Sequence, residues 1–127
     1  MDCLNSIYKT VKDIDVQIYV VDNNSTDGSQ AAVKKGFPDV KLIENKTNTG
    51  FAHANNQALS IMNGRFAVLL NSDAVLKENA IKKLLTFMTN TPCAGIAGVQ
   101  LLNDDGSRQN SIDNFPSAET EIFNKTT

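Results

Sequence analysis

The sequence predicts an α/β fold in which a mostly parallel sheet is flanked by helices. Short runs rich in β-branched and aromatic residues alternate with segments of helical periodicity, and polar loops follow the apolar runs. This alternation favours right-handed βαβ crossovers, which bring the loops that lead from strand to helix to one edge of the sheet. Ligands bind to such sheets at that edge, so we expect the functional residues there.

The length and composition of the chain exclude several classes of protein function. The 127 residues suit one domain, and we expect residues 1–127 to form a single unit. A net charge of -2 without any block of like charges argues against a nucleic-acid partner. Two distant cysteines, Cys3 and Cys93, predict neither a zinc site nor a disulfide framework. No apolar run approaches the roughly 20 residues that span a bilayer, and we expect a cytoplasmic protein without a transmembrane segment.

The first half of the chain contains two predicted helices, each followed by a strand. Apolar residues at helical spacing predict a helix over the first dozen residues. The β-branched run 16–21 predicts a buried strand. The polar stretch after it supplies N-cap residues for a helix through Lys35, with Gly36 as its left-handed stop. A second strand is expected at residues 40–44, before another polar loop.

The second half repeats this pattern and then changes character. In order, we expect a helix at 51–62, a strand at 66–70, a helix around 81–88 that ends before Pro92, and a strand at 94–102. The tight-turn residues 103–106 then predict a hairpin, with 107–112 as its returning strand. The domain therefore should close with a hairpin and not with a further crossover.

Three polar loops follow three predicted strands, at residues 22–25, 48–50 and 71–73. Their carboxylate, amide and backbone groups suit a hydrophilic ligand with a sugar ring and phosphates, and Gly50 allows the backbone to approach a phosphate closely. Asp73 follows an apolar run, where its carboxylate could hold Mg²⁺ or Mn²⁺ against a diphosphate. Helix capping is the better explanation of any one of these loops taken alone, and it is the three loops at one sheet edge that favour a ligand site.

Three segments taken together, 20–29, 48–59 and 69–76, resemble the family 2 glycosyltransferases, which have the GT-A fold. The resemblance is strongest to the rhamnosyltransferase-type members, and residues 105–111 with 115–117 are similar to the hairpin that leads into the acceptor half of that subgroup. It implies an enzyme of glycan or polysaccharide biosynthesis. Such an enzyme transfers a sugar from a dTDP- or UDP-sugar to a hydroxyl of a glycan or lipid-linked acceptor, with inversion and a divalent metal.

The resemblance also implies roles for individual residues. Asp22 and Asn23 fall where family members contact the nucleobase. Asn71 and Asp73 fall on the outer positions of the family's Asp-x-Asp motif, which makes Asp73 the expected ligand of Mn²⁺ or Mg²⁺. Asn55 stands near the diphosphate, where many relatives carry an arginine. The expected nucleotide-sugar site comprises Asp22, Asn23, Asn24, Asn48, Gly50, Asn55 and Asn71, with the metal at Asp73.

The chain departs from the family pattern at both ends. Family members begin with an apolar strand, placed in the sheet between those expected here at 16–21 and 66–70, whereas this sequence starts at the helix that follows it. We therefore expect a partial GT-A domain that lacks the first strand, in which residues 103–127 form the hairpin and the start of the acceptor region. The family's general base is expected outside this chain. We expect the protein in the cytoplasm, at the inner face of the membrane.

An alternative interpretation comes from a different functional class. The chain could be a non-catalytic fragment or a degenerate homologue that binds a nucleotide or pairs with another protein. Self-association through an open sheet edge would be one such activity.

Overall fold

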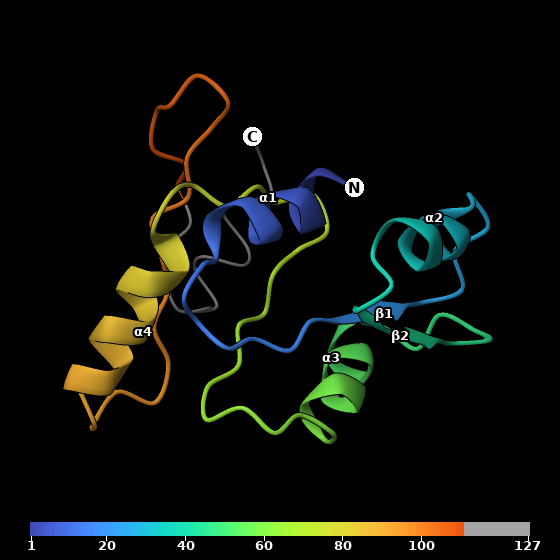
Figure 1. Cartoon of the computed structure of the whole chain (residues 1–127), viewed down its shortest axis with the longest axis horizontal. Coiled ribbons are helices and arrows are strands. Elements are labelled where there is room, and N and C mark those ends of the chain that lie inside the picture. The colour runs from blue at the N-terminus through green and yellow to red at the C-terminus, as the bar shows by residue number, and fades with distance from the viewer. Residues whose placement is uncertain (111–127) are drawn as a thin grey trace, which may run out of the picture. The chain divides into compact units, whose positions relative to one another are not determined.

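The structure is a computed structural model that describes residues 1–110 (Figure 1). Its elements are α1 (Asp2–Thr10), β1 (Tyr19–Asp22), α2 (Ser29–Gly36), β2 (Lys41–Glu44), α3 (Phe51–Leu59) and α4 (Ala80–Asn90). Helices and strands alternate from α1 to α3, which confirms the α/β class. The chain divides into two compact units, Met1–Thr91 and a second that begins at Pro92. The assignment of one domain to residues 1–127 stays a prediction.

A parallel pair of strands forms the sheet. β1 lies beside β2 with Tyr19 opposite Lys41 and Asp22 opposite Glu44. Helix α2 covers one face of this pair and α3 covers the other (Figure 1). In a parallel ladder only alternate residues of each strand point their backbone groups at the partner. The other residues of each strand therefore point theirs at an edge, and among residues 1–110 no third strand pairs with either edge.

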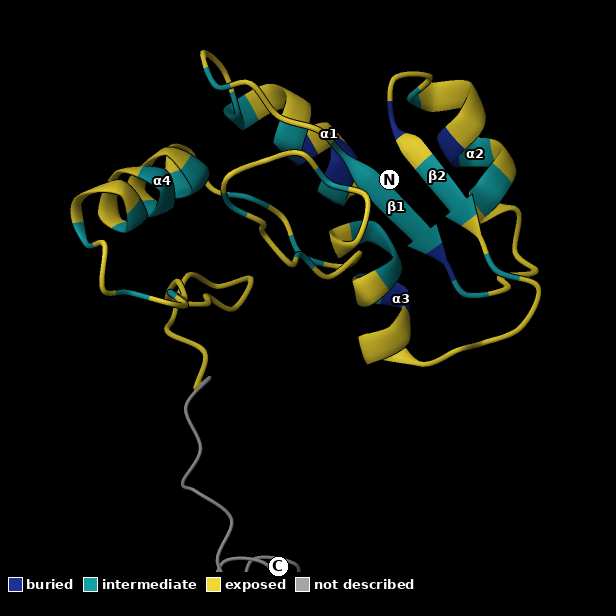
Figure 2. Ribbon diagram, turned by 90° about the horizontal axis from the view of Figure 1, so that it is seen from below, coloured by how far each residue is buried: buried dark blue, intermediate teal, exposed yellow. Residues whose placement is uncertain are grey.

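The core lies on the α2 side of the sheet. Leu4 of α1, Val33 of α2 and Val40 before β2 are at most 9% exposed and pack together (Figure 2). The half-buried hydrophobic residues packed against them are Ile7, Ile18, Val20, Phe37 and Leu42. The rings of Tyr8 and Phe37 stack with their centroids 5.5 Å apart. Helix α1 is thus fixed through the same cluster that holds α2 on the sheet.

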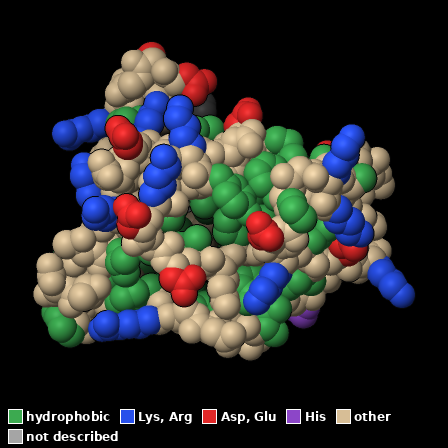
Figure 3. All heavy atoms as spheres, in the orientation of Figure 1, with side chains coloured by type: hydrophobic (Ala, Val, Ile, Leu, Met, Phe, Trp, Pro, Cys, Tyr) green, Lys and Arg blue, Asp and Glu red, His purple; other side chains and the backbone are tan. Residues whose placement is uncertain are grey.

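Two expected strands are absent from the described structure, and both predictions were wrong. Residues 66–70 are irregular, and residues 94–102 are irregular except for a single bridge residue, Leu102. Several of their apolar side chains are exposed: Val68 is 51% exposed, Leu69 57% and Ile96 94%. Hydrophobic side chains are also visible on the face of the molecule shown in Figure 3. A strand is held by backbone hydrogen bonds to a neighbour, and neither run has a neighbouring strand within residues 1–110. An apolar run therefore does not become a strand through its composition alone.

The turn of the expected hairpin is present in the second unit. The amide of Asn103 donates to the carbonyl of Ser107 at 2.9 Å, and Leu102 pairs with Arg108 in antiparallel fashion. Gly106 has φ +83°, the left-handed conformation that glycine adopts without strain. This confirms the turn at 103–106, but in the described residues the expected returning strand is reduced to the single bridge residue Arg108. Residues 111–127, which include the rest of that strand and the expected start of the acceptor region, lie outside the described residues.

Candidate functional site

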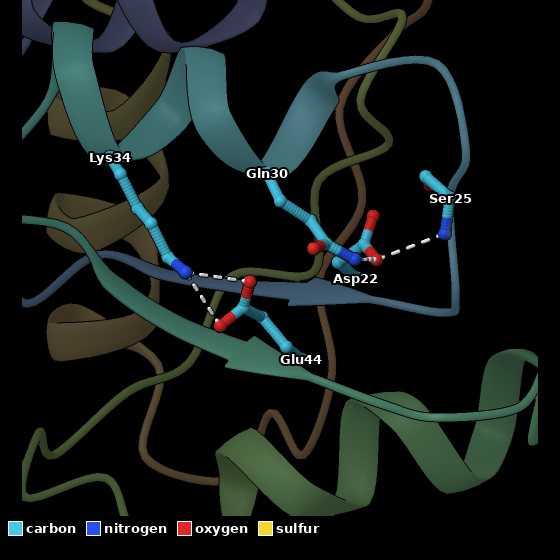
Figure 4. A network of polar contacts seen from close by, with 5 residues as sticks. All are labelled: Asp22, Ser25, Gln30, Lys34 and Glu44. Carbon is cyan, nitrogen blue, oxygen red and sulfur yellow. Dashed lines mark hydrogen bonds and ion pairs between the residues drawn. The ribbon is translucent and has the colours of Figure 1, made fainter.

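The loop after β1 is organised by a buried carboxylate. Oδ2 of Asp22 accepts hydrogen bonds from the backbone N–H of Ser25 at 3.0 Å and from Nε2 of Gln30 at 2.6 Å (Figure 4). Asp22 is only 7% exposed. Hydrogen bonding from Ser25 is the main cause that lowers the pKa of this carboxyl, burial opposes it, and Gln30 adds to the lowering. Asp22 therefore stays ionised and ties the loop to α2.

A network of amide side chains joins this loop to the one after β2. Nδ2 of Asn45 donates to Oδ1 of Asn23 at 2.9 Å and to Oε1 of Gln57 at 2.8 Å. Gln57 returns a hydrogen bond from Nε2 to Oδ1 of Asn45 at 2.9 Å. Asn23 also accepts from the hydroxyl of Thr49 at 3.1 Å and donates to the carbonyl of Gly50 at 3.3 Å. The first two predicted loops thus meet, as expected for the carboxyl ends of parallel strands.

The start of α3 carries three further candidate residues. Gly50, with φ +81°, is the N-cap, and its backbone N–H donates to Oδ1 of Asn48 at 2.9 Å. The glycine conformation confirms that the chain needs a residue without Cβ here, because an L side chain would be strained at this φ. Nδ2 of Asn55 donates to the carbonyl of Phe51 at 2.9 Å. The N–H of Gly50 is therefore already used by Asn48.

Asn24 lies at the tip of the loop after β1. Its φ is +69°, the left-handed conformation that asparagine tolerates better than most residues, and its side chain is exposed. Both neighbours are held, Asn23 by the amide network and Ser25 by the Asp22 carboxylate. Asn24 itself forms no side-chain hydrogen bond within the described structure.

The third predicted loop is attached to α1. The carbonyl of Asn71 accepts from the N–H of Ala74 at 3.1 Å and from the thiol of Cys3 at 3.5 Å. The N–H of Leu76 donates at 2.9 Å to the hydroxyl of Ser6, which is 7% exposed. Asp73, between these anchors, is exposed. Within the described residues, this turn forms hydrogen bonds to α1 but none to the loops after β1 and β2. The third loop therefore does not join the other two, contrary to the expectation.

No metal cluster accompanies Asp73. Residues 1–110 contain no group of three or more His, Cys, Asp or Glu side chains placed to hold one ion. The residues before Asp73 in the sequence, Ser72 and Asn71, also carry side-chain oxygens. Magnesium is commonly bound by one or two carboxylates together with substrate phosphates. A single carboxylate fits this metal only where a diphosphate completes the ligand set.

Several residues of the site were not predicted from the sequence. Asn45, Thr49 and Gln57 build the amide network, and Gln30 and Ser6 hold the loops after β1 and before α4. A signal was present for Asn45, which directly follows the expected strand 40–44. Gln57 lies three residues after the buried Ala54 and so shares its side of α3, a position where a polar residue is conspicuous. Ser6 has no such signal.

The described chain shows no membrane-spanning element. Among residues 1–110 no helix combines the length and the apolar content that crossing a bilayer needs.

Comparison with known proteins agrees with the resemblance. The chain is 30% identical over 108 residues to a Bacillus subtilis protein named as a teichuronic acid biosynthesis glycosyltransferase, covering 82% of this chain and 43% of that protein. It is 28% identical over 114 residues to the Mycobacterium tuberculosis N-acetylglucosaminyl-diphospho-decaprenol L-rhamnosyltransferase, covering 80% and 37%. Glycosyltransferase GlyG of Streptococcus pneumoniae is 29% identical over 87 residues, covering 66% and 29%.

These relatives are longer than the chain, which spans less than half the length of each. No solved structure matches it significantly. The family described as Glycosyl transferase family 2 matches residues 2–126, which is nearly the whole sequence. This chain therefore belongs to glycosyl transferase family 2.

Proposed function

We propose that the chain provides the donor-binding part of an inverting, metal-dependent glycosyltransferase that uses a dTDP- or UDP-sugar. The observation that carries this proposal is the hydrogen bond of 3.3 Å between Asn23 and the Gly50 carbonyl, which joins the loops at the carboxyl ends of β1 and β2. Ligands of parallel α/β sheets bind at that end. The groups gathered there are amides and backbone atoms, which suit a base and a ribose.

The metal belongs at the other candidate loop. In this proposal Asp73 binds Mn²⁺ or Mg²⁺ together with the donor diphosphate, and Asn71 offers its amide to the ribose. The bound ion would supply charge stabilisation of the leaving diphosphate. Asn55, in the second turn of α3, is assigned to the diphosphate by the resemblance and would add no charge there. Inversion requires the acceptor hydroxyl to attack the anomeric carbon from the face opposite the diphosphate, with a base that takes its proton.

The names of the relatives suggest the class of acceptor. One relative is named for teichuronic acid biosynthesis and another for a decaprenol-linked sugar. We propose by analogy a glycan or lipid-linked acceptor in envelope polysaccharide assembly, with the reaction at the cytoplasmic face of the membrane. We expect sugar transfer when this chain acts together with an acceptor-binding region like that of its longer relatives.

Calorimetric titration tests the donor site. The purified chain is titrated with UDP and with dTDP, in the presence and absence of Mn²⁺, beside the variants Asp73→Ala and Asp39→Ala. Asp39 is an exposed carboxylate before β2 and serves as the matched control. We expect binding to be at least about tenfold tighter with Mn²⁺, a difference of about 1.4 kcal/mol, and this gain to be lost in Asp73→Ala alone. A folded chain that binds neither nucleotide would contradict the proposal.

A non-catalytic pairing module is the second candidate function. Each strand of the β1–β2 pair has an edge without a strand partner in the described residues, and Val68 and Leu69 are more than half exposed. Unpaired strand edges are templates for pairing with another chain. Sedimentation of the chain over a range of concentrations separates the two candidates. A dimer that forms without nucleotide, in a chain that does not bind nucleotides, would favour pairing.

A further inference from the structure

We propose that Asn63 is a modification site, at which the folded chain deamidates spontaneously to aspartate and β-linked isoaspartate, with water as the only co-reactant. Asn63 is the single asparagine of the 127 residues that is followed by glycine. Glycine has no Cβ to crowd its amide nitrogen, and its backbone reaches conformations that are closed to other residues. The nitrogen of Gly64 therefore has the easiest approach to an asparagine side chain anywhere in the sequence.

The reaction is an intramolecular acyl transfer whose atoms balance with water alone. The backbone nitrogen of Gly64 attacks Cγ of Asn63 and forms a succinimide ring. The bond between Cγ and Nδ2 breaks, and Nδ2 leaves as ammonia with the proton that the glycine nitrogen gives up. Water then opens the ring. Hydrolysis at Cγ leaves aspartate, and hydrolysis at the main-chain carbonyl leaves isoaspartate, whose chain continues through Cγ.

The fold leaves the reacting groups of this pair accessible. Asn63 and Gly64 are both exposed and lie in irregular backbone after α3. Within the described residues, neither the side chain of Asn63 nor the N–H of Gly64 forms a hydrogen bond. The N–H of Asn63 donates to the Gln17 side chain at 3.3 Å, but this bond involves neither reacting atom. The attack therefore does not require the opening of a helix or a strand.

Other asparagines are protected by hydrogen bonds of the fold. Asn24 is exposed and precedes a small residue, but the nitrogen of that residue, Ser25, donates to Oδ2 of Asp22 at 3.0 Å. Asn55 and Asn56 lie inside α3, where the nitrogens that follow them belong to the hydrogen-bonded backbone of the helix. At each of these positions a bond must break before the ring can close.

Two aspartates, Asp27 and Asp105, also precede glycine and could form the same ring. An aspartate closes the ring only when its carboxyl is protonated, because water must leave in place of ammonia. Hydrogen bonding from Ser29 lowers the pKa of Asp27, and hydrogen bonding from Ser107 lowers the pKa of Asp105. Both carboxyls therefore stay ionised at neutral pH, and Asn63 is the position at which the ring closes first.

The modification falls where the chain after α3 is attached near β1. The hydroxyl of Tyr19 donates to the Ile61 carbonyl at 3.3 Å, and the Asn63 N–H donates to Gln17. Deamidation places a carboxylate beside this attachment, and the β-linked product adds a carbon atom to the main chain there. The segment that leads towards Asp73 thereby changes in charge and in length after synthesis.

Ageing of the purified folded chain at neutral pH tests the site. Trypsin releases residues 47–65 as one peptide, in which three other asparagines, Asn48, Asn55 and Asn56, serve as internal controls. Mass spectrometry follows the change from amide to acid at each position, and enzymatic methylation detects isoaspartate. We expect Asn63 to react at least about tenfold faster than each control, at a rate within about tenfold of that in the urea-unfolded chain. A smaller excess over the controls, a folded rate further below the unfolded one, or a product without isoaspartate would overturn the proposal.

Gly64→Ala tests whether the glycine nitrogen is the attacking group. Gly64 does not have a left-handed φ, and an added Cβ would lie 3.1 Å from the Phe66 carbonyl oxygen, so a small local shift accommodates it. Gly95→Ala is the matched control, because a Cβ there meets no atom within 4 Å. We expect deamidation of Asn63 to slow about tenfold in Gly64→Ala and to stay unchanged in Gly95→Ala. Far-UV circular dichroism shows whether both variants are folded. An unchanged rate in folded Gly64→Ala would overturn the attack by this nitrogen, and if that variant unfolds, the comparison within residues 47–65 of the unchanged chain still decides.

Discussion

Removal of the Asp22 carboxylate should be among the most destabilising changes in the loop after β1. The carboxylate accepts hydrogen bonds from the Ser25 N–H at 3.0 Å and from Gln30 at 2.6 Å, and it is 7% exposed. Hydrogen bonds to a charged group contribute about 1.5–3 kcal/mol each. Because Ser25 is exposed, water replaces part of its lost bond. We therefore expect Asp22→Ala to lower the free energy of unfolding by about 2 kcal/mol, below the sum of the two bonds.

Urea unfolding followed by far-UV circular dichroism measures this difference. Asp22→Asn keeps the shape and one acceptor, so its loss should be about half as large, near 1 kcal/mol. Asp27→Ala is the matched control, because Asp27 accepts from the N–H and hydroxyl of Ser29 in the same loop but at the surface. Its effect should be smaller than that of Asp22→Ala. A loss below about 0.5 kcal/mol in Asp22→Ala would refute the view that this carboxylate organises the loop.

Three further predictions concern stability. The pKa of Asp22 is lowered on folding by hydrogen bonding, chiefly from Ser25. The stability that this carboxylate contributes is therefore present above its unfolded pKa of about 3.9 and is lost as the pH falls through the folded pKa. Unfolding measured at decreasing pH should show a smaller loss of stability in Asp22→Asn than in the unchanged chain. Ser6→Ala should cost about 1 kcal/mol in urea unfolding, since it leaves the Leu76 N–H without its partner; an unchanged midpoint would contradict this. Lys34→Met should cost less than about 1 kcal/mol, because its ion pair with Glu44 is exposed, and a larger loss would show that the pair is shielded from water.

The elements that the sequence predicted well are those with local signals. The helix at α1 follows from apolar residues at helical spacing. Helix α2 forms where expected but includes Gly36, which does not adopt the left-handed conformation of a stop. The strands β1 and β2 form where β-branched residues precede polar loops, although β1 begins at Tyr19 and not at residue 16. Helix α3 likewise ends at Leu59, three residues early. Such boundaries depend on packing more than on composition.

The two failed strands show what a local pattern cannot supply. Residues 66–70 are as apolar as β1, yet a strand needs a neighbour with which to exchange backbone hydrogen bonds, and composition does not tell whether one is present. Here the preceding segment is held by side chains to β1 and to Gln17, which lies just before it. The hydroxyl of Tyr19 donates to the Ile61 carbonyl at 3.3 Å, and the N–H of Asn63 donates to the Gln17 side chain at 3.3 Å.

The candidate site was predicted in its residue types and in part of its geometry. The polar loops after β1 and β2 meet because parallel strands end at one edge, a rule that needs only the order of elements. Which amides face inward was not predictable, because Asn23 and Asn24 are identical and adjacent in the sequence. Their difference arises from Asn45 and Gln57, distant residues that only the fold brings together.

The stacked rings of Tyr8 and Phe37 give the chain an internal optical probe. The sequence has no tryptophan and two tyrosines, so its tyrosine fluorescence comes from Tyr8, on α1, and Tyr19, on β1. Tyr8 lies 5.5 Å from the Phe37 ring, whereas Tyr19 lies beneath the Lys41 ammonium at 5.0 Å. Replacing Tyr19 by phenylalanine would leave Tyr8 as the sole tyrosine emitter. Its fluorescence would then follow the docking of α1 on the sheet through an unfolding transition, without any attached dye.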